Sequence, residues 1–140
     1  MRIFSLLLLL TLSLWARSDS IKSLGYLSDY TSALHLAQKE NKPLMLVVVT
    51  SYCPWCRKFE RKSLASKSVS SVVKKYFVAV IVDRNKDAET FPELFQSPRI
   101  PVVFFIDPNS GKAFWETIGY LNRVDFLDAL GEAQSLFQNR

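Results

Sequence analysis

The sequence predicts an α/β fold in which a mixed central sheet lies between helices, as a three-layer sandwich. Short apolar runs rich in β-branched and aromatic residues occur at 44–50, 77–82 and 102–106, which is typical of buried strands. Helical spacing of apolar residues separates the first two runs, so these strands should be parallel with a right-handed crossover. An alternating segment follows the third run after a turn and predicts an antiparallel hairpin.

The first half of the chain contains the signals for two helices besides the one that follows the first strand. Asp29 is an N-cap residue for a helix that runs to about Glu40, where residues 41–43 end it. A break is expected over residues 64–68. Apolar residues at helical spacing over residues 69–76 then predict a short helix, or a kinked continuation of the preceding one.

The second half predicts a helical turn, a hairpin and a terminal helix. Residues 91–95 are expected to form at most one turn, because Pro92 fits only the first turn of a helix. Residues 107–111 have the composition of a turn, and residues 112–118 alternate in the manner of an edge strand. Asn122 is a cap residue for the C-terminal helix.

The N-terminus has the pattern of a secretory signal peptide. Arg2 gives a basic start, residues 3–14 are almost wholly apolar, and Ala16 and Ser18 are the small residues of a cleavage site after Ser18. The apolar run is shorter than the ~20 residues that a spanning helix needs. We therefore expect a signal peptide over residues 1–18, one domain over residues 19–140, no stable membrane span after cleavage, and a periplasmic or secreted protein.

The overall charge is mildly basic. The chain of 140 residues has a formal net charge of +5, and no basic cluster is interleaved with aromatic residues as nucleic-acid binding would require. The basic residues are expected to form a solvated face. We expect a monomer that does not bind nucleic acid.

The two cysteines of the chain form a Cys53-Pro54-Trp55-Cys56 motif between a predicted strand and a predicted helix. The unpaired amides and positive dipole end of a helix favour a negative charge, so a thiol there is expected to ionise below the free value of about 8.5. Cys53 should be the exposed, attacking sulfur and Cys56 the buried, resolving one. A loop this short would stabilise the fold poorly as a staple, which favours redox chemistry.

Three other cysteine chemistries fit less well. Covalent haem attachment needs a histidine after the motif, where Arg57 stands. A closed zinc site wants four ligands, and the remote His35 would bring the total to three at most. A cysteine protease needs a cysteine–histidine pair, which His35 is not placed to supply. We expect no bound cofactor and no metal, since the dithiol itself is the redox centre.

The order of strand, aromatic residue, Cys-x-x-Cys, helix, and then Ile100-Pro101 before another apolar strand resembles the thioredoxin superfamily. The segment around the cysteines is similar to secreted bacterial thioredoxin-like proteins, among them the soluble C-terminal domain of the transmembrane thiol:disulfide interchange reductase and periplasmic thioredoxins of sulfur metabolism. The resemblance covers roughly residues 28–137.

The resemblance implies roles for residues beyond the cysteines. Pro101 should follow a cis peptide bond and lie against the disulfide, whereas the sequence alone favours a trans proline at a strand start. Ile100 should pair its backbone with the substrate peptide. Apart from the resemblance, Trp55 lies between the two sulfurs in the sequence and should be partly exposed and offer apolar contact area to a partner, or else pack on its own domain.

The acid that usually assists the cysteines is missing from its familiar place. Many thioredoxins carry a buried aspartate six residues before the first cysteine, where this chain has Val47. Glu60 stands where the similar reductase domain has a glutamate, and it is a candidate for tuning the sulfurs or accepting the proton of Cys56. The alternative is a solvent-exposed helical glutamate paired with Arg57 or Lys58.

These observations predict an exported thiol–disulfide oxidoreductase. The first choice is a reductant that takes electrons from a membrane-bound or soluble redox partner and passes them to disulfides of other exported proteins. A second choice is an oxidase or isomerase that uses the same dithiol in the opposite direction. A third is a non-catalytic module that binds extended peptides beside Pro101.

Overall fold

A computed structural model describes Ile21 and residues 23–140. The predicted signal peptide over residues 1–18 and its cleavage site after Ser18 lie outside the described residues. The helices and strands have these bounds: α3 Tyr30–Glu40, β1 Leu44–Val49, α4 Pro54–Phe59, η1 Glu60–Leu64, α5 Lys67–Tyr76, β2 Val78–Asp83, η2 Glu93–Phe95, β3 Val102–Ile106, β4 Ala113–Ile118 and α6 Arg123–Gln138.

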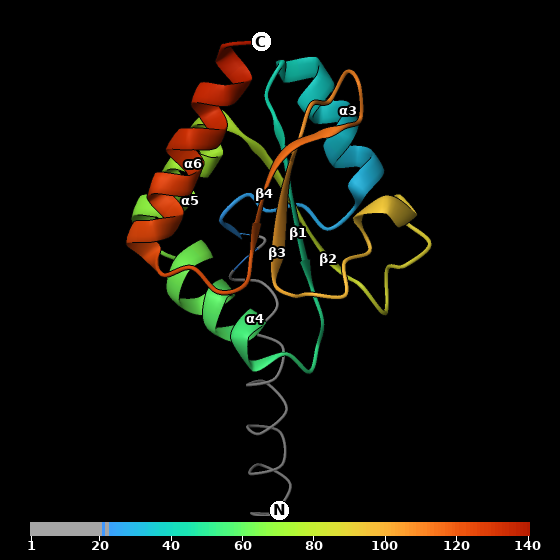
Figure 1. Cartoon of the computed structure of the whole chain (residues 1–140), viewed down its shortest axis with the longest axis vertical. Helices are drawn as coiled ribbons and strands as arrows, with labels where there is room; N and C mark the ends of the chain where they lie inside the picture. Colours follow the sequence, from blue (N-terminus) through green and yellow to red (C-terminus); the bar gives the residue numbers. More distant parts are fainter. Residues whose placement is uncertain (1–20, 22) are drawn as a thin grey trace, which may run out of the picture.

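The four strands form one mixed sheet in the order β2-β1-β3-β4 (Figure 1). β1 pairs in parallel with β2, as the intervening helices require, and antiparallel with β3. β3 and β4 form the predicted antiparallel hairpin. The outer edge of β2 is partly covered, because the backbone of Leu27 bonds to Ala79 and Ile81.

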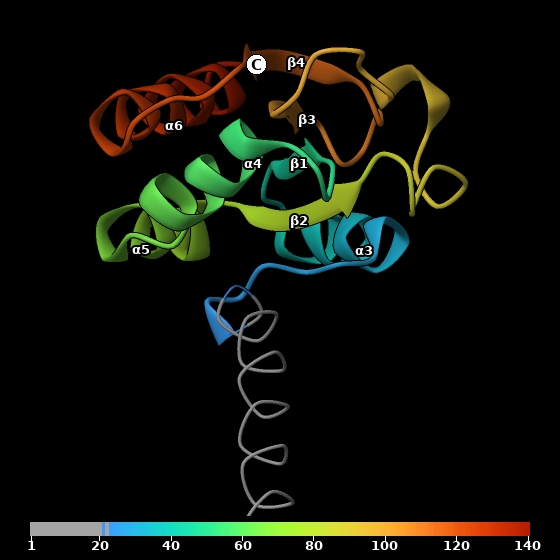
Figure 2. The ribbon, with the colours of Figure 1, turned by 90° about the horizontal axis from the view of Figure 1, so that it is seen from below.

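Helices cover both faces of this sheet and make the three layers that the sequence predicts. α3 lies on one face, and α4, α5 and α6 lie on the other (Figure 2). Strands β1 and β3 are buried along their whole length, which explains why they read as continuous apolar runs rather than as alternating ones.

Alternate residues of the strands belong to two separate cores. Met45, Val47 and Val49 point to the side of α5 and α6, whereas Leu44, Leu46 and Val48 point to the side of α3. This is the period-two geometry of a strand whose two faces are both covered. α3 contributes its predicted apolar stripe through three buried residues, Tyr30, Ala33 and Ala37.

The helix after the cysteines is longer than the sequence indicates. The break expected over residues 64–68 is wrong in its first residue and in its last two: α4 continues into the π-helical turn η1 through Leu64, and α5 already begins at Lys67. The π turn is held from inside the protein. The hydroxyl of buried Ser63 donates to the carbonyl of Leu121 at 2.6 Å, and the Tyr26 hydroxyl donates to the carbonyl of Leu64 at 3.0 Å.

The edge strand β4 does not keep the simple alternation that its sequence predicts. The register shifts between Phe105 and Ile106, so Trp115 pairs with Phe105 while Ala113 pairs with Ile106. Phe114 is the extra residue of this β-bulge. As a result Phe114 and Trp115 are both half-buried and both contact the Phe105 ring.

Candidate active site

The carboxyl end of β1 delivers the cysteines to the start of a helix. Cys53 is the N-cap of α4, and Pro54 occupies the first turn, where a missing amide costs nothing. Cys53 and Cys56 form a disulfide. Cys56 is fully buried and Cys53 is half-exposed, so only the first sulfur is open to a partner protein.

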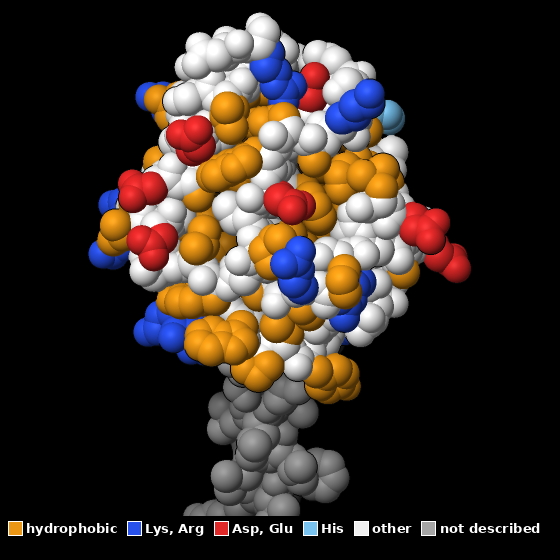
Figure 3. Space-filling model, in the orientation of Figure 1, with side chains coloured by type: hydrophobic (Ala, Val, Ile, Leu, Met, Phe, Trp, Pro, Cys, Tyr) orange, Lys and Arg blue, Asp and Glu red, His pale blue; other side chains and the backbone are white. Residues whose placement is uncertain are grey.

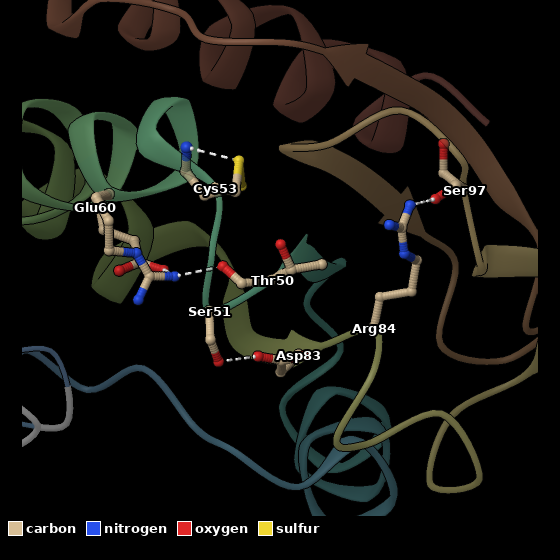
Figure 4. The surroundings of a disulfide bond; sticks show 9 residues. Thr50, Ser51, Cys53, Glu60, Asp83, Arg84 and Ser97 are labelled. Atoms are coloured by element: carbon tan, nitrogen blue, oxygen red, sulfur yellow. Dashed lines mark hydrogen bonds and ion pairs between the residues drawn. A yellow bond between two sulfur atoms is a disulfide. The ribbon is translucent and has the colours of Figure 1, made fainter.

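The backbone around Cys53 is suited to a negative sulfur. The Cys56 amide donates a hydrogen bond to the Cys53 sulfur at 3.1 Å (Figure 4). The same amide belongs to the first turn of a helix, where amides lack intrahelical acceptors. A hydrogen bond to the charged form of a group stabilises that form. Once the disulfide is reduced, this arrangement favours the thiolate of Cys53.

The loop that leads into β3 contains a cis proline. The Ile100–Pro101 peptide bond is cis, as the resemblance implies. Half-buried Ile100 borders the same apolar cluster as Cys53 and Cys56. The carbonyl of buried Pro101 accepts a hydrogen bond from the Gly119 amide at 2.7 Å, and Gly119 has a φ of +87° that favours glycine. This bond ties the proline loop to the loop that precedes α6.

Trp55 lies on the surface beside the cysteines, as expected, with 57% of its area exposed. Its ring also contacts Tyr120 at a centroid distance of 5.6 Å. The ammonium of Lys58 lies 5.1 Å from the Trp55 ring and 4.7 Å from the Tyr120 ring. The two rings and the cation therefore form one aromatic–cation cluster (Trp55, Lys58 and Tyr120) at the mouth of the site.

Glu60 lies mostly within the protein and is paired with an arginine. Its side chain is 14% exposed, and its Oε1 accepts a hydrogen bond from the Arg57 guanidinium at 3.1 Å. The ion pair agrees with the interpretation of Glu60 as a helical glutamate paired with Arg57 or Lys58. The burial disagrees with the solvent exposure which that interpretation assumed, and it is compatible with a group that tunes the sulfurs. Burial raises the pKa of Glu60 above its ordinary value, while the positive charge of Arg57 opposes this shift and Asp83 adds to it.

Glu60 does not bond directly to either cysteine in the part of the chain that is described. Figure 4 shows its carboxylate beside the guanidinium that also reaches the carbonyl of Thr50, at 2.9 Å. Arg57 thus connects the helix of the cysteines to the end of β1. Val47, at the place of the usual buried aspartate, is completely buried among apolar residues.

A second carboxylate holds the loop that leads to the cysteines. Asp83, at the end of β2, accepts a hydrogen bond from the Ser51 hydroxyl at 2.7 Å (Figure 4). Burial raises the pKa of Asp83, but the bonds from Ser51 and from the amides of Asn85 and Lys86 outweigh it and leave the pKa below its ordinary value. Asp83 is therefore a charged anchor for this loop.

The sequence indicates one of the two side-chain groupings at the site and not the other. The pairing of Arg57 with Glu60 is indicated by their spacing of three residues on a helix. Nothing local indicates that Tyr120 would meet Trp55 and Lys58, because this contact joins distant parts of the chain.

Within residues 21 and 23–140, no group of three or more histidine, cysteine, aspartate and glutamate side chains is arranged to hold a metal ion. No helix of the described part is long and apolar enough to span a membrane.

A half-exposed sulfur at a helix N-cap, a buried partner sulfur one turn on and a cis proline before β3, on a mixed sheet between helices, define the class of thioredoxin-fold proteins with a redox-type cysteine pair. This supports thiol–disulfide oxidoreductase chemistry. The chain belongs to the thioredoxin-like family, whose profile matches residues 26–108.

Curated relatives share a short stretch of sequence with this chain. Spermatogenesis-associated protein 20 of Rattus norvegicus is 39% identical over 54 residues, which is 39% of this chain and 7% of the relative. The same protein of Homo sapiens is also 39% identical over 54 residues, with the same coverage. The match thus spans only 7% of the length of these relatives.

Solved structures are similar over most of the chain. A thioredoxin from Thermus thermophilus has a TM-score of 0.68 at 24% identity, over 76% of this chain and 85% of that one. DsbH oxidoreductase has a TM-score of 0.68 at 22% identity, over 79% and 84%. The DsbD C-terminal domain of Neisseria meningitidis in its oxidised form has a TM-score of 0.61 at 18% identity, over 77% and 98%. These similarities establish the fold.

Proposed function

We propose that this protein is an exported thiol–disulfide oxidoreductase that reduces disulfides in other exported proteins. The observation that carries the proposal is the accessibility of the two sulfurs: Cys53 is half-exposed at a helix N-cap, whereas Cys56 is buried. Export is supported by the signal-peptide pattern of residues 1–18.

In the reductive direction, the Cys53 thiolate attacks one sulfur of the substrate disulfide. A Cys53–substrate disulfide forms, the substrate disulfide breaks, and the second substrate sulfur leaves as a thiolate that takes up a proton. Cys56 then loses its proton and attacks Cys53, which releases the first substrate thiolate. Two electrons pass to the substrate, and the Cys53–Cys56 disulfide is later reduced by the dithiol of a redox partner.

Glu60 is the candidate that receives the proton of Cys56. It is mostly buried, follows Cys56 by one helical turn, and has a pKa raised by burial. Because its carboxylate bonds to Arg57 and not to a sulfur, we propose that a water molecule carries the proton between Cys56 and Glu60. Ile100, beside Pro101, is proposed to align the substrate backbone at Cys53.

The opposite direction is favoured by one observation. The Cys56 amide and the helix start stabilise the Cys53 thiolate, and a stabilised reduced form makes a dithiol a stronger oxidant. Equilibration with glutathione separates the two directions. A reductant is expected near the value of about −270 mV found for thioredoxin, and an oxidant near about −120 mV.

An activity assay with cysteine variants tests the proposal as a whole. We expect the wild-type protein with dithiothreitol to reduce insulin, and Cys53→Ser to lose this activity completely. Cys56→Ser should trap a mixed disulfide with the substrate through Cys53. A Cys53→Ser protein with full biological activity would overturn the proposal in favour of a non-catalytic peptide-binding module, and refolding of a reduced substrate without insulin reduction would favour an oxidase.

A further inference from the structure

We propose that the helix after the cysteines selects substrates that carry acidic residues beside the reactive disulfide. This inference rests on the proposed function and adds the substrate class. Residues 57–62 contain four basic side chains and one acidic one. The single acid, Glu60, is paired with Arg57. The remaining cations, Lys58, Arg61 and Lys62, are free to meet a partner.

These three cations share one side of the helix. Their spacing of three and four residues places them on the same side, away from the residues that α4 and η1 bury, which are Cys56, Phe59, Ser63 and Leu64. Arg61 and Lys62 are exposed, and Lys58 is half-exposed. In the described part of the chain, no carboxylate forms an ion pair with Lys58, Arg61 or Lys62.

Of the three unpaired cations, Lys58 is closest in sequence to the cysteines, and two rings orient it. Lys58 contacts both Trp55 and Tyr120 by its ammonium group, and such contacts contribute about 0.5–1 kcal/mol at exposed sites. A lysine held in this way loses less freedom on binding than a free one. The exposed Trp55 ring and the half-buried Tyr120 ring offer apolar contact to the substrate next to its disulfide, and the cations continue the surface along the helix.

Hydrophobic and basic side chains lie together on the surface near α4. Figure 3 shows hydrophobic side chains beside Lys and Arg side chains at the end of the molecule where α4 lies. Arg99, which precedes Ile100, is exposed on the loop of the cis proline and adds positive charge there. Asp125, near the Tyr120 loop, bonds to the neutral amide of Asn122 and keeps its one negative charge, which Lys58, Arg61, Lys62 and Arg99 outnumber. Charge complementarity therefore favours an acidic polypeptide.

The test compares two disulfide-linked peptides of equal length that differ in the residues flanking the disulfide, aspartate in one and serine in the other. The fully reduced protein is mixed with each, and the second-order rate constants are measured by stopped-flow tryptophan fluorescence. We expect the acidic peptide to react about tenfold faster at low salt, since opposite charge speeds encounter. The ratio of the rate constant for the acidic peptide to that for the serine peptide should fall towards one in 1 M NaCl, where the Debye length is about 3 Å.

Variants assign the preference to the proposed surface. Lys58→Gln should lower the ratio about threefold, within the range for an exposed pair, and the triple variant Lys58→Gln, Arg61→Gln, Lys62→Gln should bring it close to one. Lys39→Gln, an exposed lysine in the last turn of α3, is the matched control and should leave the ratio unchanged. Tyr120→Phe should keep the preference, whereas Tyr120→Leu should weaken it.

Each outcome has a distinct meaning. The acidic preference is overturned if both peptides react at equal rates at low salt and Lys58→Gln does not change those rates. The proposed oxidoreductase function is then left intact. No reaction with either peptide overturns the proposed function itself. Equal peptide rates combined with binding to phosphatidylserine vesicles, lost in the triple variant but absent with phosphatidylcholine vesicles, would assign the cations to an anionic lipid surface and overturn the inference.

Discussion

At the scale of single residues, our proposal assigns the proton of Cys56 to Glu60, which is paired with Arg57. The chain has Val47 where many thioredoxins have a buried aspartate, and Val47 is fully buried. A mostly buried carboxylate is instead supplied by the helix of the cysteines, next to an arginine that also reaches the carbonyl of Thr50. The ion pair keeps the buried carboxylate from being an uncompensated charge.

The pH dependence of disulfide reduction tests this role. Glu60→Gln is expected to shift the pH profile of insulin reduction, because glutamine cannot take the proton of Cys56. The measurement is the initial rate between about pH 5 and 9. Glu93→Gln, an exposed glutamate on η2, is the control and should not move the profile. A Glu60→Gln profile that superimposes on the wild type would remove Glu60 from the mechanism.

The raised pKa of Glu60 also affects stability. Between its ordinary value and its raised folded value, the folded state binds more protons than the unfolded state, so the free energy of unfolding should fall as pH rises through this window. Glu60→Gln should remove that fall, which urea unfolding at several pH values above about 4.5 would measure. The contribution of Asp83 to stability depends on pH in the opposite direction. Because its pKa is lowered in the folded state, Asp83 stabilises the protein at pH values above its ordinary pKa, and this stabilisation is lost as the pH falls through the lowered pKa.

At the scale of elements, the π turn η1 connects the helix of the cysteines to the loop that carries Tyr120. Ser63 is fully buried and donates to the carbonyl of Leu121, the residue that follows Tyr120. The same loop bonds to Pro101 through Gly119. These two bonds link the loop that carries Tyr120 both to η1 and to the cis proline.

Loss of the Ser63 hydroxyl should therefore weaken both the fold and the site. Ser63→Ala leaves the Leu121 carbonyl without this donor and should lower the free energy of unfolding by about 1–3 kcal/mol. Ser71→Ala removes an exposed hydroxyl bonded to Lys67 within α5 and should change it by no more than about 0.5 kcal/mol. Urea denaturation of both variants measures this difference, and equal values would mean that the Ser63 bond does not hold the loop.

Sequence patterns predicted the elements well where the pattern is local. Continuous apolar runs indicated β1 and β3 correctly because both faces of the sheet are covered. The π turn was missed because residues 60–64 have ordinary helix formers, and the bonds that hold Ser63 and Leu64 come from distant residues. The bulge at Phe114 was missed because its register is set by pairing with β3.

The same distinction applies to the site. Cys53, Cys56 and their exposures followed from a motif placed between a strand and a helix. The cis bond before Pro101 required the family resemblance, since the sequence alone favoured trans. The contact of Tyr120 with Trp55 and Lys58 could not be predicted, because it depends on how the loop before α6 packs.

At the scale of the whole molecule, the Phe105 ring joins the sheet to its helical layer. Phe105 is fully buried and contacts the rings of Phe77, Phe114 and Trp115. It thereby links the end of α5, the bulged edge strand and the core that also holds Cys56. The position of the buried sulfur depends on this core.

Truncation of Phe105 should be costly. Phe105→Ala is expected to lower the free energy of unfolding by about 3–5 kcal/mol, because it removes a large buried ring and leaves a cavity. Leu136→Ala, at a residue that is 39% exposed, should cost much less. Denaturation curves of the two variants give the comparison. A loss at Phe105 no larger than that at Leu136 would show that this ring does not support the core.

The proposed chemistry requires a Cys53 thiol that the helix start makes acidic while Cys56 stays protected. The most direct measurement is a titration of thiolate absorbance in the reduced protein, with Cys56→Ser used to assign the signal to Cys53. We predict that Cys53 ionises well below the value of about 8.5 for a free cysteine. Ionisation of Cys53 at or above that value would contradict a thiol that the helix start makes acidic.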